Sequence, residues 1–229
     1  MDRRTAAFVR GQFLTGFCPG CRKERAPVCS DCVAALAGSV ARIDVDGRVI
    51  THALRYEPPI SNLLIAFKDR GEWTLRNLLA LLLARSIAHL LLTRQEDEQS
   101  ALDKPLLLVP VASTAASIRL RDADPIADLA ISAARILRRS GSDVRTKRLL
   151  ALRSGHRDHV GLSRRERESN MRDAFTVDSR IGVKGVHGDV VIVDDVVTTG
   201  ATLAAAHGAL STAGLQVLGA AVIARSQRD

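Results

Sequence analysis

The chain has 229 residues, of which 46% are hydrophobic and 3% aromatic, and its formal net charge at pH 7 is +8. This length and apolar content allow one globular domain with a small appendage. The first residues are partly basic but contain no uninterrupted apolar run, which argues against a secretory signal. The most apolar segment, Leu75–Leu92, carries Arg76, Arg85 and His89, which would be costly in lipid. We therefore expect a buried amphipathic helix there, no membrane insertion and a cytoplasmic location.

The excess of positive charge lies mainly between Arg135 and Arg172. Such a basic surface is typical of anion or nucleic-acid binding, and it is also typical of a solvated face. Because aromatic residues make up only 3% of the chain, no stacking platform for single-stranded nucleic acid is evident. Both interpretations of the charge stay open at this point.

All four cysteines fall within the segment CPGCRKERAPVCSDC. They are Cys18, Cys21, Cys29 and Cys32. Two Cys-x-x-Cys pairs this close together have the spacing of a tetrahedral site in which four thiolates bind one Zn²⁺. Two disulfides would suit a cytosolic chain poorly, and a thioredoxin-type redox motif needs only one pair. We predict a structural zinc knuckle, because four protein ligands leave no open position for catalysis.

The rest of the chain alternates between β and α patterns. In chain order, we predict a strand at 47–57, a short helix at 58–68, a long helix at 72–92, a polar loop at 94–104 and, at 105–114, a short buried strand that ends in a loop. These are followed by a helix at 125–140, a strand at 143–152, a mobile loop leading into a helix at 153–170, a strand at 188–196, a helix at 201–214 and a strand at 215–224. The order strand, helix, strand predicts parallel neighbours. The fold class is therefore α/β, with an open, mainly parallel sheet flanked by helices at 46–229 and the segment with the zinc knuckle at 1–45.

The most informative segment is VVIVDDVVTTGAT, residues 190–202. Four apolar, β-forming residues lead to Asp194 and Asp195, and a threonine-rich stretch then begins a predicted helix. Ligands of open α/β sheets bind beyond the carboxyl ends of the strands. The first N–H groups of a helix favour anions, whereas carboxylates suit sugar hydroxyls or hydrated Mg²⁺. A ribose 5-phosphate group meets both requirements and is the economical candidate.

Other phosphate-binding patterns are absent from the sequence. There is no Gly-x-x-x-x-Gly-Lys-Ser/Thr, and no Gly-x-Gly-x-x-Gly follows a strand, so a P-loop or a dinucleotide site is poorly supported. A purely structural acidic strand end is the remaining alternative, although buried strands rarely end in two uncompensated carboxylates.

The segment at 190–202 resembles the thirteen-residue phosphoribosyl pyrophosphate (PRPP) motif of type I phosphoribosyltransferases. Together with the cysteine knuckle and the segments YEPPISNLLIAFKDRG, LLLVPVAS and SRRERESNMRDAF, it makes the chain resemble the ComF family within them. The resemblance implies that Asp194 and Asp195 bind the ribose hydroxyls, that one loop wraps the 5-phosphate and that a second loop faces the pyrophosphate. The first loop comprises Thr198, Thr199, Gly200, Ala201 and Thr202, and the second comprises Val111, Ala112 and Ser113.

The resemblance further implies an enzyme that transfers the phosphoribosyl group of PRPP to a nucleophile, with Mg²⁺ and with loss of pyrophosphate. The basic segment 153–170 would close over the site, and its arginines are candidates for neutralising the leaving group. These are Arg153, Arg157, Arg164 and Arg165, each of which is equally explained as a surface arginine. Purine-salvage relatives carry an acidic residue where this chain has Thr198, so a purine acceptor is not favoured.

The chain departs from the family pattern at three positions. Relatives usually have glycine where this chain has Asp122, and an added carboxylate near a pyrophosphate site would repel the ligand. They tend to have threonine and glutamine where His156 and His159 align. These two histidines are read either as ligands or acid–base groups, or as exposed loop side chains.

Two alternatives to catalysis remain. One is a PRPP-sensing regulator that shares the site but releases no pyrophosphate. The other is a DNA-associated accessory protein, because ComF relatives are linked to competence and DNA uptake. In that case the zinc knuckle and the basic surface would contact DNA phosphates, and the PRPP site would be vestigial or regulatory.

Overall fold

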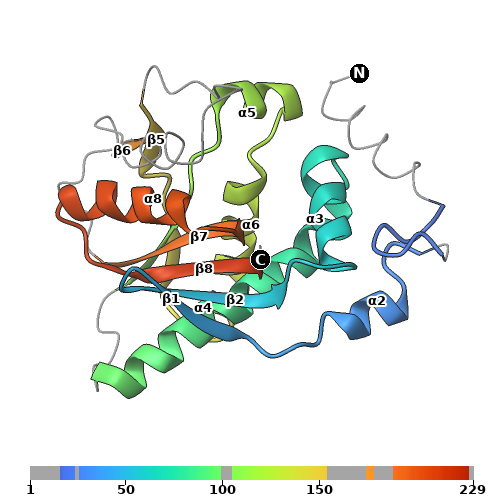
Figure 1. The fold of residues 1–229 in the computed structure, drawn as a ribbon, viewed down its shortest axis with the longest axis horizontal. Coiled ribbons are helices and arrows are strands. Elements are labelled where there is room, and N and C mark those ends of the chain that lie inside the picture. Colours follow the sequence, from blue (N-terminus) through green and yellow to red (C-terminus); the bar gives the residue numbers. More distant parts are fainter. Residues whose placement is uncertain (1–15, 24–25, 99–104, 154–173, 178–187, 227–229) are drawn as a thin grey trace.

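The computed structural model describes residues 16–23, 26–98, 105–153, 174–177 and 188–226, and its main sheet has six strands in the order β1-β2-β8-β7-β3-β4 (Figure 1). The strands are β1 (Ala41–Val45), β2 (Arg48–Arg55), β8 (Val217–Arg225), β7 (Asp189–Val197), β3 (Leu106–Pro110) and β4 (Val144–Thr146). β1 and β2 form an antiparallel pair, and the neighbouring pairs from β2 to β4 are parallel. The predicted α/β fold with an open, mainly parallel sheet is confirmed.

The central strands are apolar along most of their length because both faces of the sheet are covered. Every residue of β3 is buried, and so are Val190–Val193 of β7 and Leu218–Ala224 of β8. Since β2, β8, β7 and β3 run parallel, their carboxyl ends meet at one edge of the sheet. This is the edge at which open α/β sheets bind ligands.

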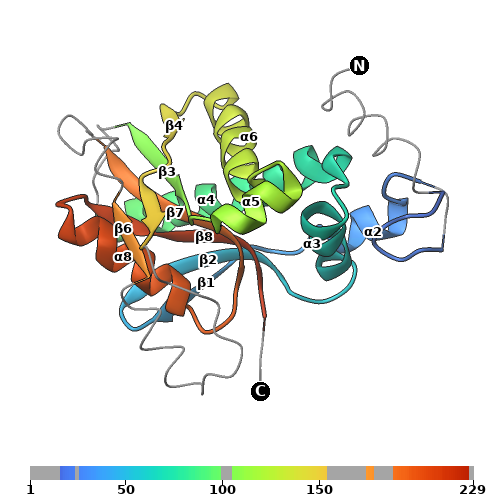
Figure 2. The same cartoon turned by 90° about the horizontal axis from the view of Figure 1, so that it is seen from above.

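Helices lie on both faces of the sheet (Figures 1 and 2). The first layer contains α3 (Ile60–Asp69), the short turn η1 (Trp73–Leu75), α4 (Arg76–Glu98) and α6 (Pro125–Arg139). The second contains α8 (Ala201–Thr212) and a small antiparallel pair, β5 (Leu150–Leu152) and β6 (Phe175–Val177). Each layer has its own hydrophobic cluster against the sheet, with Phe67 and Leu83 in the first and Leu203 and Leu210 in the second.

Local sequence signals set the ends of two predicted helices. The Asp124 carboxylate accepts a hydrogen bond from the Ala127 N–H at 3.3 Å, and Pro125 occupies the first turn of α6. α8 ends at Thr212 and is followed by Gly214, whose φ of +81° is a left-handed conformation that suits glycine. Both helices confirm the predicted boundaries to within two residues.

Two predicted elements are wrong in extent. α4 continues to Glu98, so the polar residues after Arg94 begin as helix rather than as loop. Glutamate and glutamine are good helix formers, and a helix already anchored by packing extends through them readily. The single strand predicted at 143–152 is divided into β4, in the main sheet, and β5, in the small one.

The long helix α4 belongs to the core. The segment Trp73–Arg94 is long and apolar enough to cross a membrane by length and composition alone, but 50% of its most apolar window is buried inside the protein. Leu79, Leu83 and Ile87 recur at helical spacing and are fully buried. α4 therefore packs as the buried helix that the sequence predicts.

The segment with the cysteines packs against α3. It includes α2 (Ser30–Ala35), and Leu36 joins the hydrophobic cluster of the first layer. Asn62 of α3 donates a hydrogen bond from Nδ2 to the Gly20 carbonyl at 2.7 Å. Residues 41–45 pair with β2 in the main sheet. The division of the chain at residue 45 stays a prediction.

α5 (Ala115–Arg121) lies in a segment without a predicted helix and ends at a left-handed residue. The Thr114 side chain begins this helix by accepting a hydrogen bond from the Ser117 N–H at 3.1 Å. Asp122 follows it with φ of 51° and ψ of 25°, and its side chain is exposed. The glycine that the family resemblance leads us to expect here would adopt this conformation without the steric cost of a Cβ atom.

Replacing Asp122 with glycine is expected to raise the free energy of unfolding by about 0.5 kcal/mol. The change removes left-handed strain of about 1 kcal/mol and a carboxylate at the carboxyl end of a helix, and the greater freedom of the unfolded chain offsets part of this gain. Urea unfolding of the wild type, Asp122→Gly and Asp122→Ala measures the effect. A glycine variant less stable than the alanine variant would contradict it.

Candidate functional site

The adjacent aspartates lie near the carboxyl end of β7, where α3 supplies a cation. Lys68 Nζ lies 2.8 Å from Asp195 Oδ2, and the side chains are 30% and 9% exposed, respectively. Lys68 follows the buried Leu64 by four residues, so it continues the apolar face of α3 into the protein. The ion pair joins two elements that are far apart in sequence.

The charges at this point shift one another's pKa. Burial raises the pKa of Asp194 well above its ordinary value, and Asp195 raises it further, against the opposing effect of Lys68. Burial alone would lower the pKa of Lys68, but Asp195 and Asp194 raise it above its ordinary value. One lysine thus faces two carboxyl groups, and their oxygens are the hard ligands that Mg²⁺ takes. The residues present therefore fit a divalent cation.

A cavity of about 180 Å³ opens beside the aspartates. Its walls are Val111, Ala112 and Ser113 after β3, Thr114, Ser117 and Arg121 at α5, Pro125 and Ile126 of α6, and Lys68 and Asp194. The Val111 N–H donates to the Val193 carbonyl at 3.0 Å, so β7 holds the first of these segments in place. The loop expected to face pyrophosphate, one of the expected ribose ligands and two cations thus border one cavity. Their individual roles stay predictions.

Polar contacts fix two side chains of the cavity wall. Ser113 Oγ donates to Asp124 Oδ1 at 3.2 Å, and the same carboxylate caps α6. Arg121 Nη2 donates to Asp69 Oδ1 at 3.1 Å, which links α5 to the end of α3. Asp122 is not part of this wall. No contact among the described residues supports the expected repulsion between Asp122 and a pyrophosphate group.

The loop expected to bind the 5-phosphate forms the amino end of α8. Thr198 and Thr199 are exposed, and Gly200 is buried with φ of +81°. This positive φ favours glycine, and a Cβ atom on Gly200 would also lie only 3.1 Å from Val45 Cγ1, a tight contact. The first N–H groups of α8 are thereby presented at the ligand-binding edge of the sheet.

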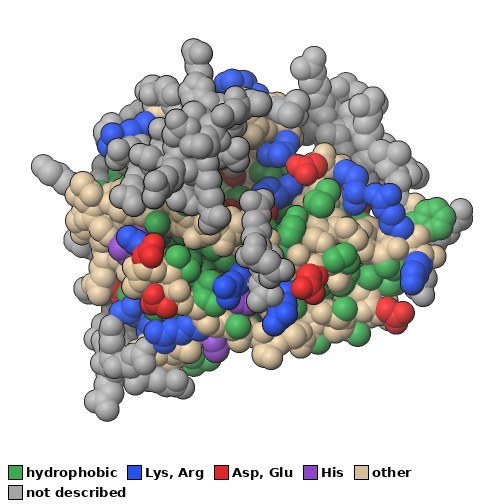
Figure 3. All heavy atoms as spheres, in the orientation of Figure 1, with side chains coloured by type: hydrophobic (Ala, Val, Ile, Leu, Met, Phe, Trp, Pro, Cys, Tyr) green, Lys and Arg blue, Asp and Glu red, His purple; other side chains and the backbone are tan. Residues whose placement is uncertain are grey.

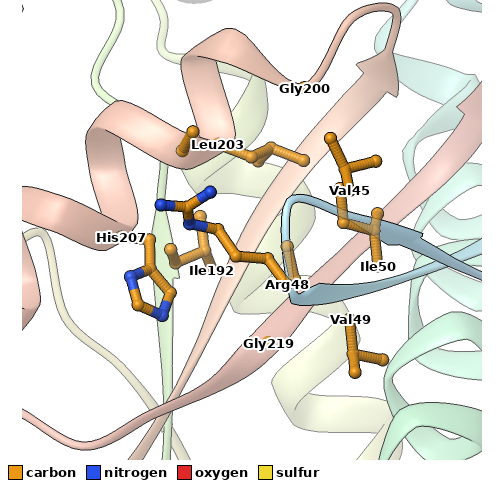
Figure 4. Close-up of a pocket in the computed structure, with 11 residues that line it drawn as sticks. Val45, Arg48, Val49, Ile50, Ile192, Gly200, Leu203, His207 and Gly219 are labelled. Carbon is orange, nitrogen blue, oxygen red and sulfur yellow. The ribbon is translucent and has the colours of Figure 1, made fainter. Parts of the chain in front are cut away.

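A small apolar cleft lies beneath this loop (Figure 4). Val45, Ile192 and Leu203 help to line it, and its volume of about 10 Å³ holds one water molecule at most. Figure 4 shows the Arg48 side chain extending from the β1–β2 pair toward α8, between Leu203 and His207. The cleft is a packing contact that positions the loop rather than a site for a substrate.

Of the four candidate arginines, only Arg153 is among the described residues. It is exposed after β5, and its N–H donates to the Ala174 carbonyl at 2.9 Å. The others, and both loop histidines, lie outside the described residues: Arg157, Arg164, Arg165, His156 and His159. Their roles stay predictions.

The four cysteines come together as predicted. Their Sγ atoms all lie within 4.8 Å of one another, and those of Cys21 and Cys29 are 3.6 Å apart. A tetrahedral Zn²⁺ ion with Zn–S bonds of about 2.3 Å holds its sulfurs about 3.8 Å apart, so the cluster fits zinc. Burial raises the pKa of the Cys18 thiol, but the backbone N–H groups of Cys29, Cys21 and Gly20 outweigh this and lower it to about 6. The cluster is compatible with a structural zinc ion.

The basic segment Arg135–Arg148 is partly neutralised by carboxylates. Arg145 Nε lies 3.3 Å from Asp143 Oδ1, and Arg148 Nη2 lies 3.5 Å from Asp124 Oδ2. Figure 3 shows a different face, which carries α8 and the β1–β2 pair, and there basic side chains are interspersed with acidic and hydrophobic ones.

The two basic residues on the cavity wall, Lys68 and Arg121, had no role in the sequence prediction. Lys68 could have been found, because a charged residue on the apolar face of a predicted helix needs a partner. Arg121 gave no such signal, because its position depends on α5, a short helix between two longer elements.

Comparison with known proteins gives a distant structural likeness. No protein-family model and no curated protein matches the chain. A solved structure of adenine phosphoribosyltransferase from Saccharomyces cerevisiae, complexed with D-2,5-dideoxy-2,5-imino-altritol 1,6-bisphosphate and adenine, matches with 11% sequence identity and a TM-score of 0.34. The match covers 87% of this chain and 90% of that one. The fold assignment rests on the strand order and helix layers described above.

Proposed function

We propose that this protein binds PRPP with Mg²⁺ at the carboxyl edge of its sheet and transfers the phosphoribosyl group to an acceptor. The observation that carries the proposal is the cavity bordered by Asp194, Lys68 and the 111–113 loop, on the sheet that also presents the amino end of α8. Carboxylates, cations and helix N–H groups are thereby combined at one edge. Membership of the ComF family and a cytoplasmic location rest on the sequence and belong to this proposal.

Each part of PRPP has a matching set of groups. The 5-phosphate would bind the N–H groups and hydroxyls of the Thr198–Thr202 loop, and the ribose hydroxyls would donate to Asp194 and Asp195. The diphosphate would occupy the cavity, where Lys68 and Arg121 provide positive charge. Mg²⁺ supplies further neutralisation of the diphosphate when bound, and the aspartates would hold it directly or through water.

The reaction makes a bond between C1′ and the acceptor and breaks the bond between C1′ and the pyrophosphate oxygen, which keeps the electron pair. Lys68 and Arg121 would stabilise the negative charge that grows on the departing pyrophosphate. The loops would exclude water from the electron-poor sugar. An acceptor that attacks through an N–H or O–H group must also lose a proton, to water or to pyrophosphate, because Thr198 provides no basic group.

Calorimetric titration of PRPP and Mg²⁺ tests the proposal. We expect dissociation constants of about 1 μM for the zinc-loaded wild type and a roughly 100-fold loss for Asp194→Asn/Asp195→Asn. Asp189→Asn, at the opposite end of β7, is the matched control and should bind like the wild type. Absence of binding by the folded wild type refutes the proposal. Binding without pyrophosphate release for any acceptor would favour a PRPP-sensing regulator.

The DNA-associated alternative stays a prediction, and no described feature favours it. Two arginines of the basic segment are already paired with carboxylates. DNA binding that falls log-linearly with salt and is lost on charge reversal within 135–148 would support it.

A further inference from the structure

Two arginines stand side by side at the carboxyl edge of the sheet. Arg55 ends β2, Arg225 ends β8, and the two residues are partners in the parallel ladder. Arg225 is also the partner of Val197, the last residue of β7, which directly precedes the Thr198–Thr202 loop. Both arginines therefore share an edge with the proposed PRPP site. Arg225 lies one strand away from β7, and Arg55 lies two strands away.

The backbone that carries this pair is fixed. The Tyr56 N–H donates to the Arg225 carbonyl at 2.7 Å, and the Ser226 N–H donates to the Val197 carbonyl at 2.9 Å. The ladder thus continues one residue beyond the strands. Side chains on such a rigid element bind a ligand with little loss of backbone freedom.

The positive charge of the pair is not neutralised within the described part of the chain. No carboxylate oxygen of those residues lies within 4.0 Å of either guanidinium group. Like charges on directly opposed residues of neighbouring strands destabilise a sheet. A bound anion would remove this cost.

His52 lies three residues before Arg55 on β2 and is 7% exposed. Burial lowers its pKa, the hydrogen bond with the Leu54 carbonyl opposes this, and the charges of Arg225 and Arg55 lower the pKa further. Its Nδ1 lies 3.0 Å from the Leu54 carbonyl oxygen, which can only accept, so the neutral ring donates there. The ring adds no charge, and anion binding falls to the two arginines.

We infer that Arg55 and Arg225 bind a carboxylate of the acceptor, so that the acceptor is a small carboxylate-bearing molecule. This inference rests on the proposed function. The guanidinium fork matches carboxylate geometry. In the strand order, the cavity proposed for the diphosphate lies on the β3 side of β7, whereas the arginines lie on the β8 and β2 side. An acceptor held by the arginines would therefore approach β7 from the side away from the cavity proposed for the diphosphate.

Matched probe pairs test the acceptor class. Binding of nicotinate and nicotinamide, and of orotate and uracil, is measured by ligand-observed NMR with PRPP and Mg²⁺ present, in the wild type, Arg55→Gln and Arg225→Gln. At least one carboxylate should bind roughly tenfold more tightly than its neutral mate in the wild type, and either substitution should abolish the preference. Arg145→Gln replaces an arginine of β4 that is paired with Asp143, and this variant should keep the preference.

Titration of PRPP into the same variants separates this inference from the proposed function. Both arginine variants should bind PRPP within about twofold of the wild type. A wild type that does not bind PRPP refutes the proposed function and the inference with it. Normal PRPP binding without any carboxylate preference overturns the inference alone. Loss of PRPP affinity in Arg225→Gln would assign the arginine to the 5-phosphate instead and also overturns it.

Discussion

Replacing Lys68 with methionine is expected to lower the free energy of unfolding by about 2 kcal/mol near pH 7.5. The substitution keeps an unbranched side chain but leaves the Asp195 carboxylate, 9% exposed, without the cation that lies 2.8 Å from it. Breaking a fully buried ion pair costs about 3–5 kcal/mol. Because the Lys68 side chain is 30% exposed, water screens part of the interaction and the loss is smaller. Urea unfolding measures it.

The loss of stability caused by Lys68→Met should grow as the pH rises. In the folded wild type, burial and Asp195 already raise the pKa of Asp194, while Lys68 opposes the rise. Without Lys68 the pKa of Asp194 rises further, so the folded chain holds a proton on this carboxyl group that the unfolded chain releases. Such a group contributes its stability below the unfolded pKa of about 3.9, and this stability is lost as the pH rises through the folded pKa. Unfolding at pH 4 should therefore show a smaller difference than unfolding at pH 8.

A double variant distinguishes the lost charge from a lost packing contact. Lys68→Met/Asp195→Asn removes both partners of the ion pair and should recover most of the stability, because residue 195 no longer carries a charge without a partner and no longer raises the pKa of Asp194. Arg145→Met breaks an ion pair whose side chains are 64% and 56% exposed, and it should change the stability by less than about 0.5 kcal/mol. If the double variant is as unstable as Lys68→Met, the ion pair is not the cause.

The sequence predicted best the elements that contain an unbroken buried apolar run or a clear capping signal. β3 and residues Val190–Val193 of β7 are such runs, and α6 has both a capping aspartate and a proline in its first turn. β1 is mostly exposed, and it is a strand because β2 offers it a partner. β5 and β6 are three residues long, and their pairing joins segments that no local pattern connects.

In the candidate site, too, local features could be predicted from the sequence, whereas contacts between distant segments could not. Asp194, Gly200 and the 111–113 loop stand at strand ends, where the chemistry of the segment is local and can be read from the sequence. Lys68 is separated from Asp195 by 127 residues, and Arg121 depends on a seven-residue helix. Which cation reaches a carboxylate pair is decided by how α3 and α5 pack on the sheet. Helix periodicity indicates that Lys68 points inward, but it does not indicate that its partner is Asp195.

Removal of zinc is expected to unfold the cysteine segment and to loosen α3. Structural zinc sites contribute about 10 kcal/mol or more of binding free energy, which a segment with three buried cysteines and few other core residues cannot replace. α3 is tied to this segment by the 2.7 Å hydrogen bond between Asn62 and Gly20, and a Cβ atom on Gly20 would lie 3.0 Å from Pro59 Cβ, just before α3. Loss of the segment should therefore increase amide hydrogen exchange in both regions.

The measurement combines metal analysis with hydrogen exchange. Protein purified with zinc should hold about one zinc per chain, and a chelator should remove the metal and the exchange protection of 16–36 together. Because α3 carries Lys68, the chelated protein should also bind PRPP roughly tenfold more weakly. Asn62→Ala is the matched control: it should keep the zinc and lose protection only in the first turn of α3. Protection of 16–36 that survives complete metal removal would show that the four cysteines need no metal to hold their fold.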